Sequence, residues 1–211
     1  MTSIVVISAG LSTPSSTRLL ADRLAEAVSA TRPAATVTHL ELRPLAHQLT
    51  DQLLTGFPGP ELAAAQDAVR AADGLVVVTP VFAASYSGLF KMFFDVLEPE
   101  TIDGTPVLIA ATAGTARHSL VLEHALRPLF AYLHAVVVPT GVFAATDDFA
   151  SAELTQRIGR ATREFAGLLS PGNAANATNA AATPSRRRTV ADEFADVTPF
   201  ERLLAQVSSA S

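Results

Sequence analysis

Five apolar segments stand out along the 211-residue chain. Four of them are continuous apolar runs, whereas the second alternates between polar and apolar positions. Continuous runs are typical of strands buried on both faces of a parallel sheet, and alternation is typical of a strand with one exposed face. We therefore expect four buried strands and one strand at an edge. The five segments are 3–9, 36–42, 75–78, 104–112 and 135–142, the last broken near Pro139.

Segments with apolar residues at helical spacing separate these strands. Strands that alternate with helices predict a parallel sheet. The predicted fold is α/β, a flavodoxin-like three-layer αβα sandwich whose five-stranded parallel sheet has the order 2-1-3-4-5. The expected helices are 18–31, a short one near 46–54, 61–72, one starting at Gly88, 117–133 with a kink at Pro128, and 154–169.

The chain is expected to form one domain over residues 1–169. Residues 170–188 include a run rich in Ala and Asn, a composition typical of a flexible linker. Residues 189–211 carry spaced apolar side chains, and we expect them to dock onto the domain or onto a neighbouring subunit. A frayed chain end is the alternative.

The stretch from Val76 to Asp95 organises the rest of the chain. Its apolar run stops at Thr79-Pro80, and because proline has no backbone N–H we expect the strand pairing to end about there. Ser87 is placed to cap a helix that begins at Gly88. In open α/β sheets ligands bind outside the carboxyl ends of strands, so residues 79–87 are expected to line a site.

A second candidate loop, residues 10–17, follows the first strand and is rich in hydroxyl groups. Free N–H groups and the positive end of a helix dipole make the start of a helix an anion site, and hydroxyls add neutral donors. The alternative is that Ser15 and Ser16 only cap the helix, which needs a single hydroxyl. We favour phosphate binding, because the loop holds more hydroxyls than capping requires.

A third loop, residues 113–116, follows the fourth strand, and its small residues allow close approach of a flat ligand to the backbone. All three loops are expected at one edge of the sheet. Phosphate on the first loop, with a ring between the other two, fits a planar cofactor that carries a phosphate. The sequence has neither the GxGxxG pattern of dinucleotide-binding folds nor the GxxxxGK[ST] pattern of P-loops.

Residues 3 to about 169 resemble the NAD(P)H-dependent FMN reductases of the flavodoxin-like superfamily. Within this family they are most similar to the actinobacterial enzymes that supply reduced flavin to two-component monooxygenases. The family pattern P-x-Y-N-x-S-x-x-G-x-L-K-x-x-x-D is matched here by Pro80, Ser85, Gly88, Lys91 and Asp95. Phe82 replaces the usual Tyr and Ala83 the usual Asn, which removes two polar side-chain contacts but keeps backbone contacts to the flavin possible.

The resemblance implies which residues bind the cofactor. The phosphate is expected on the first loop, where Ser12 stands in place of the family's arginine, so weaker and exchangeable flavin binding is implied. The ring is expected to contact the other two loops, and Arg117 and His118 to face the flavin or the nicotinamide. The implied cofactor-binding residues are Ser12, Ser15, Ser16, Thr17, Pro80, Val81, Phe82, Ala83, Ser85, Ala113, Gly114 and Thr115.

The function that this implies is transfer of a hydride from NAD(P)H to FMN, with reduced flavin supplied to a partner monooxygenase. Because the cofactor supplies the chemistry, no catalytic acid or base is expected. The alternatives are an FMN-bound reductase of quinones, azo dyes or metal oxyanions, and a non-catalytic flavin electron carrier. A homodimer or homotetramer is implied by the family. Replacing both Ser15 and Thr17 by Ala is expected to weaken FMN binding without unfolding the protein.

Composition excludes several other classes. The chain has no cysteine, which rules out disulfides, thiolate metal sites and a cysteine nucleophile. A net charge of −5 argues against broad nucleic-acid binding. No long uncharged apolar run or basic leader is present, so we expect a cytoplasmic protein without membrane contact. Lys91 and Asp95 are expected to form a surface pair, and His118 and His124 lack the clustered partners of a metal site.

Overall fold

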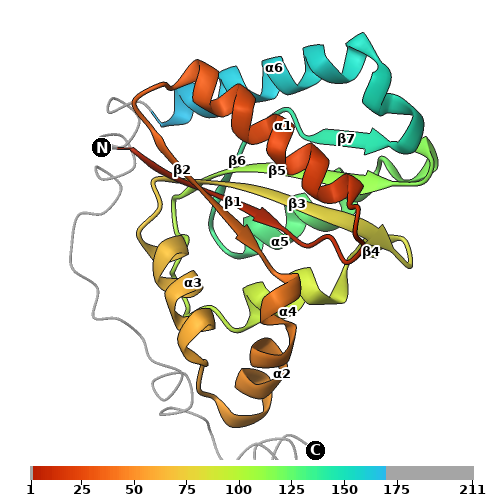
Figure 1. Ribbon diagram of the computed structural model, residues 1–211. Coiled ribbons are helices and arrows are strands. Elements are labelled where there is room, and N and C mark those ends of the chain that lie inside the picture. The colour runs from red at the N-terminus through yellow and green to blue at the C-terminus, as the bar shows by residue number, and fades with distance from the viewer. Residues whose placement is uncertain (1, 170–211) are drawn as a thin grey trace, which may run out of the picture. The chain divides into compact units, whose positions relative to one another are not determined.

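The computed structural model describes residues 2–169, and in that part of the chain seven strands form one sheet. The order is β2-β1-β3-β5-β6, with β7 also beside β5 and the short β4 beside β3 (Figure 1). The predicted order 2-1-3-4-5 matches the parallel strands in part: the fifth strand is divided in two around Pro139, and the short antiparallel β4 was not expected. The strands are β1 Ser3–Ser8, β2 Thr36–Glu41, β3 Gly74–Phe82, β4 Ser85–Tyr86, β5 Pro106–Ala113, β6 Val136–Val137 and β7 Val142–Ala145.

Helices cover both faces of this sheet, which gives the predicted three layers (Figure 1). On one face lie α1 (Ser16–Thr31) and α6 (Ala152–Leu168), and on the other lie α2 (Ala46–Thr55), α3 (Pro60–Arg70), α4 (Gly88–Asp95) and α5 (Arg127–Tyr132). Alternate residues of each central strand pack into two separate hydrophobic cores. In β3, Val76 and Val78 pack toward α1 and α6, whereas Leu75 and Val77 pack toward the other helices. Burial on both faces explains the continuous apolar runs.

The edge strand β2 also behaves as its alternating sequence predicts. Its side chains are exposed or half-buried along its whole length, and its one neighbour is β1, with which it pairs in parallel from Ser3↔Thr36 to Ser8↔Glu41. One residue further on, the Leu42 N–H donates to the Ser8 carbonyl oxygen over 3.0 Å. The ends of β1 and β2 therefore lie side by side at the carboxyl edge of the sheet.

The parallel pairing of the third strand ends at Pro80, as expected, but the strand itself runs two residues further. β3 continues to Phe82, pairing with β5 as far as Pro80↔Thr112 and then with β4 in an antiparallel hairpin. The pairing of β1 with β3 stops at Ser8↔Val78, so β3 is an edge strand beyond that point. An edge strand tolerates proline, because no neighbour needs the missing N–H.

The helical segment expected over 117–133 is interrupted beside Pro128, as expected, but it is divided into more pieces than a single kink would give. The segment forms a 3-10 turn at Ala116–His118, a π-helical turn at Leu122–Leu126, and α5 from Arg127. Pro128 has no N–H for the carbonyl four residues before it, and its ring clashes with that carbonyl in a regular helix. The preceding turn widens instead, and the Arg127 N–H donates to the Leu122 carbonyl five residues back.

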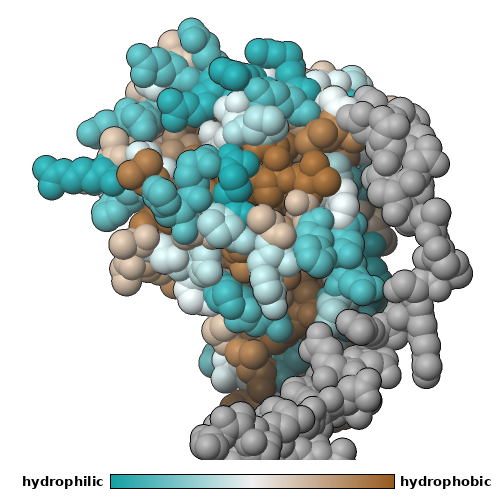
Figure 2. Space-filling model, turned by 180° about the vertical axis from the view of Figure 1, so that it is seen from behind, coloured by the Kyte–Doolittle hydropathy of each residue, from teal (hydrophilic) through white to brown (hydrophobic). Residues whose placement is uncertain are grey.

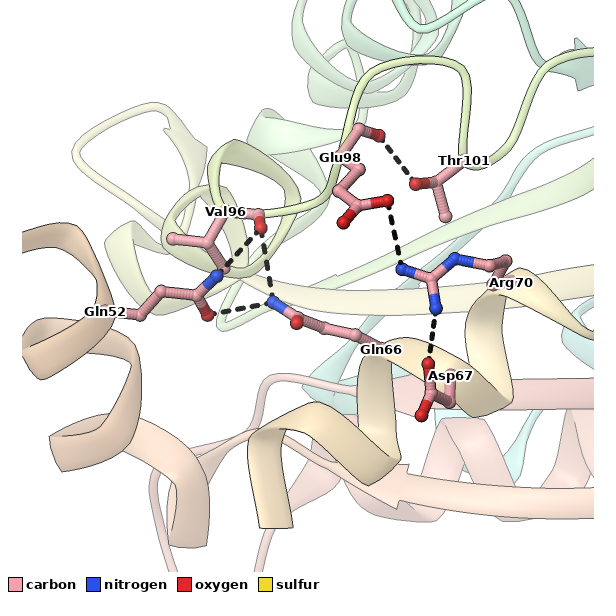
Figure 3. Close-up of polar contacts among 7 residues, drawn as sticks. All are labelled: Gln52, Gln66, Asp67, Arg70, Val96, Glu98 and Thr101. Carbon is pink, nitrogen blue, oxygen red and sulfur yellow. Dashed lines mark hydrogen bonds and ion pairs between the residues drawn. The ribbon is translucent and has the colours of Figure 1, made fainter. Parts of the chain in front are cut away.

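Polar contacts fasten α2 and α3 to the end of α4 (Figure 3). The side-chain amides of Gln52 and Gln66 each donate to the Val96 carbonyl oxygen over 3.2 Å, and Gln66 also donates to the Gln52 side-chain oxygen over 2.9 Å. Carbonyl groups at the end of a helix have no intrahelical partner, and these two glutamines satisfy one of them. This contact helps to fix α2, and with it the turn at Arg43–Leu45 that precedes α2.

Within the described residues, no helix is long and apolar enough to cross a membrane. The expectations for the linker at 170–188 and the docking segment at 189–211 lie outside the part of the chain that the structure describes.

Candidate functional site

Three loops gather at the carboxyl edge of the sheet, as predicted. The strand register brings the starts of these loops close together, because Ser8 of β1 pairs with Val78 of β3, and Pro80 of β3 pairs with Thr112 of β5. Loop one (residues 9–17, including the first residues of α1) follows β1, loop two (residues 80–87) contains the hairpin at the end of β3, and loop three (residues 113–116) follows β5. Because parallel strands end at the same edge, residues distant in the sequence here surround one region.

Loop one ends by capping α1. The Ser15 hydroxyl accepts a hydrogen bond from the Arg18 N–H over 3.2 Å, so this serine is the N-cap. The N–H groups of Ser16 and Thr17, in the first turn, have no intrahelical acceptor. The side chains of Ser12 and Ser16 are exposed. Capping therefore accounts for Ser15, and the hydroxyls of Ser12 and Ser16 remain accessible to a ligand.

Thr17 differs from the other residues predicted to bind phosphate. Its side chain is buried, and its hydroxyl lies 2.8 Å from the hydroxyl of Thr112 on β5. The Thr17 side chain thus joins α1 to the end of β5, while its N–H belongs to the first turn of the helix. The double variant Ser15→Ala, Thr17→Ala is now expected to lower stability as well as flavin affinity, since it removes the cap and leaves the Thr112 hydroxyl without this partner.

Gly10 was not among the predicted site residues, although the structure gives it a clear role. A Cβ atom at this position would lie 2.1 Å from the Ser15 Oγ atom and 3.2 Å from the Cβ atom of Thr17. Only glycine therefore lets loop one fold this closely over the start of α1. The position of this glycine directly after the first buried strand is the feature of the sequence that could have indicated its role in the site.

Loop two is a tight hairpin rather than an open loop. Phe82 pairs with Ser85, and the two residues between them, Ala83 and Ala84, have φ angles of +48° and +65°. Positive φ at both central residues is the geometry of a type I′ turn, which matches the twist of the flanking strands. Phe82 is 47% exposed at the tip, so it presents an apolar side chain beside the backbone of the turn.

Substitution of Ala84 by glycine should stabilise this hairpin. Alanine is disfavoured at positive φ, whereas glycine is not, and we expect Ala84→Gly to raise the free energy of unfolding by about 0.5–1 kcal/mol. The thermal midpoint should rise by about 2 °C. In the control Ala64→Gly, on the exposed side of α3, the same change should lower stability by about 1 kcal/mol. A lower midpoint for Ala84→Gly would contradict the turn geometry.

Two buried hydroxyl residues, at the two ends of the stretch 79–87 that was expected to line the site, close the base of this hairpin. The Thr79 hydroxyl accepts a hydrogen bond from the Ser87 N–H over 3.0 Å, and Ser87 in turn caps α4 through the Phe90 N–H. The predicted capping role of Ser87 is confirmed. Thr79 and Ser87 are 0% and 1% exposed, so they act on the position of the hairpin and not on a ligand directly.

Loop three consists of small residues, as predicted. Ala113 is the last residue of β5, Gly114 and Thr115 are exposed, and the exposed Arg117 and His118 follow in the 3-10 turn. A Cβ atom at Gly114 would meet no atom of residues 2–169 within 4 Å, so these residues leave the space above this backbone open. Lys91 and Asp95 form the expected ion pair on the surface of α4. In residues 2–169 no three His, Asp or Glu side chains are placed to hold a metal ion.

The donors at this edge fit a flavin mononucleotide. Loop one offers unpaired helix N–H groups and two exposed hydroxyls, which are the donors that bind a phosphate monoester. Gly10 leaves no room for a side chain there, while Gly114 leaves space above loop three. The backbone of loops two and three is the remaining surface on which a planar ring can lie.

Comparison with known proteins agrees with this arrangement. The chain is 40% identical over 146 residues to the FMN reductase (NADPH) of Pseudomonas aeruginosa, an alignment that spans 69% of this chain and 78% of the relative. It is 41% identical over 153 residues to the NADH-dependent FMN reductase SfnF of Pseudomonas fluorescens, which covers 72% of this chain and 81% of the relative.

A solved structure described as an oxidoreductase from Corynebacterium diphtheriae superposes with a TM-score of 0.76 at 54% identity, covering 80% of this chain and 97% of the other. A flavodoxin, WrbA-like protein from Agrobacterium tumefaciens, at 17% identity and a TM-score of 0.56 with 79% and 99% covered, shares the fold. The family model described as NADPH-dependent FMN reductase matches residues 2–150. The chain therefore belongs to the NADPH-dependent FMN reductase family.

Proposed function

We propose that this protein uses NAD(P)H to reduce FMN. The observation that carries the proposal is the anion site of loop one, at the same sheet edge as the two loops that can receive a ring. Membership of the FMN reductase family supports it over the other functions of this fold. Bound FMN supplies a ring that accepts a hydride from the nicotinamide, so the protein needs to bind and orient rather than to transfer protons itself.

The residues of the chain have distinct parts in this function. The N–H groups of Ser16 and Thr17, with the hydroxyls of Ser12 and Ser16, would hold the phosphate. The predicted ring contacts are the backbone from Pro80 to Ala83, Ser85 in β4, and residues 113–115. Two hydrogen bonds, Thr17 to Thr112 and Ser87 to Thr79, keep the three loops at fixed positions relative to the sheet.

We further propose that the flavin exchanges with solution. The hydroxyls that loop one offers, those of Ser12 and Ser16, are neutral, and neutral hydrogen bonds to phosphate are weaker than those of a guanidinium. An exchangeable flavin suits an enzyme that delivers reduced FMN to a separate monooxygenase. The relatives bear both NADPH-dependent and NADH-dependent names, so the donor has to be measured.

A homo-oligomer is part of this proposal. The most exposed large apolar side chains in residues 2–169 are Leu54 and Phe57, at and just beyond the end of α2, which are 81% and 79% exposed, and Tyr132 at the end of α5, which is 82% exposed. Figure 2, which shows the molecule from behind, has apolar areas separated by hydrophilic side chains. One of these areas is at the lower end of the view, the end at which Figure 1 places α2. Where such side chains join into a contiguous apolar patch, the patch is typical of an association surface. Sedimentation at several concentrations tests this.

Anaerobic stopped-flow absorbance at the band of oxidised flavin tests the function itself. With protein, added FMN and either NADH or NADPH, we expect rapid bleaching with at least one donor and a rate that saturates with free FMN. Flavin that stays bound through gel filtration, with turnover of quinone and no dependence on free FMN, would indicate the FMN-bound reductase. Absence of bleaching with both donors would contradict the proposal and leave an electron carrier.

A further inference from the structure

Arg43 approaches loop one from a different part of the chain. Its guanidinium donates from Nη1 to the Thr13 hydroxyl over 2.7 Å, although 30 residues separate the two in the sequence. The position of Arg43 follows from the sheet: Leu42 is hydrogen-bonded to Ser8, and the neighbouring side chains of Leu42 and Leu45 are buried. Arg43 is thus held at the carboxyl edge beside the loop expected to bind phosphate.

The charge of Arg43 is not neutralised within residues 2–169, where it forms no ion pair with a carboxylate. Arg18, the other arginine beside loop one, is bound by the carboxylates of Asp22 and Glu41. This pairing also screens Glu41, which would otherwise repel an anion near the end of β2. A guanidinium has five N–H donors, and Thr13 accepts from one of them.

We propose that Arg43 binds the phosphate of FMN together with loop one. This inference rests on the proposed FMN reductase function and assigns the positive charge in the site to a residue outside the loop. A guanidinium forms charge-assisted hydrogen bonds with phosphate, often two at once, which neutral hydroxyls cannot do. Arg43 therefore makes the site selective for flavin mononucleotide over riboflavin, which lacks the phosphate.

Flavin binding to the purified apoprotein, followed by fluorescence quenching, tests this role. For Arg43→Gln we expect the dissociation constant of FMN to rise about tenfold and that of riboflavin to stay within about twofold. The affinity of the unchanged protein for FMN should fall with added salt more steeply than that of the variant. Arg43→Lys should recover part of the affinity, since it keeps the charge but not the planar fork.

Two further variants separate this role from a structural one. Thr13→Val removes the contact to the loop but keeps the guanidinium, so it should affect FMN binding less than Arg43→Gln does. Arg163→Gln is the control, because it removes an exposed charge on α6 far from loop one. Arg163 lies two residues from Phe165, which packs near Gly74 at the opposite edge of the sheet. This variant should change neither the dissociation constant of FMN nor that of riboflavin.

Equal losses for FMN and riboflavin in Arg43→Gln, or no loss of FMN affinity, would overturn the proposal for Arg43. Failure of the unchanged protein to bind either flavin would instead contradict the proposed function. The two failures are therefore distinguishable in one set of titrations.

Discussion

Replacing Gly10 by alanine should raise the dissociation constant of FMN about 100-fold, because several phosphate contacts depend on the shape of one loop. The new Cβ atom would lie 2.1 Å from the Ser15 Oγ atom and 3.2 Å from the Ser15 Cβ atom, so Ser15 has to move. Moving it breaks the cap on the Arg18 N–H. Thr17 cannot retreat, because its hydroxyl is bound to Thr112.

Flavin fluorescence titration measures this effect, and a thermal melt measures its structural part. Loss of the cap alone should lower the free energy of unfolding by about 1 kcal/mol, which leaves the protein folded at 25 °C. Gly159→Ala is the matched control: within residues 2–169, and apart from the backbone of its own helix, the one neighbour of an added Cβ is the Nη1 atom of Arg163 at 3.4 Å, an ordinary contact, and the position lies within α6. Unchanged FMN affinity in Gly10→Ala would remove loop one from the binding site.

Thr79→Val should lower the free energy of unfolding by about 2 kcal/mol, because it leaves the Ser87 N–H buried without its acceptor. Valine has nearly the shape of threonine, so the loss comes from the hydroxyl. For a chain of this size the thermal midpoint should fall by about 6 °C. The same hydrogen bond closes the base of the hairpin, and its loss should also weaken FMN binding several-fold.

Thr79→Ser restores the hydroxyl and should recover most of the stability, which separates the hydrogen bond from the packing of the methyl group. Denaturant unfolding of the three proteins gives the comparison, together with FMN titration of each. A Thr79→Val protein as stable as the unchanged chain would show that the Thr79–Ser87 contact does not hold the hairpin.

The places where prediction and structure disagree share a cause. The parallel pairing of β3 ends at Pro80 as expected, yet the strand continues to Phe82 in a hairpin with β4 that the sequence did not indicate, and β1 has already stopped pairing with β3 at Ser8. In 117–133 the apolar spacing correctly indicated a helical segment, but the spacing contains no information on how the chain accommodates Pro128. Both outcomes depend on neighbours in space or on backbone geometry, and not on local pattern.

The sequence by itself determined the main strands, the two-sided burial of the central ones and the cap at Ser87, because hydrophobic periodicity and capping act over a few residues, and it offered the cap at Ser15 as an alternative to phosphate binding. The motif around Pro80 and Gly88 also indicated the family. Only the tertiary structure decided that Thr17 binds Thr112 and that Arg43 reaches Thr13. These pairs lie 95 and 30 residues apart, and they meet because parallel strands bring their carboxyl ends to one edge.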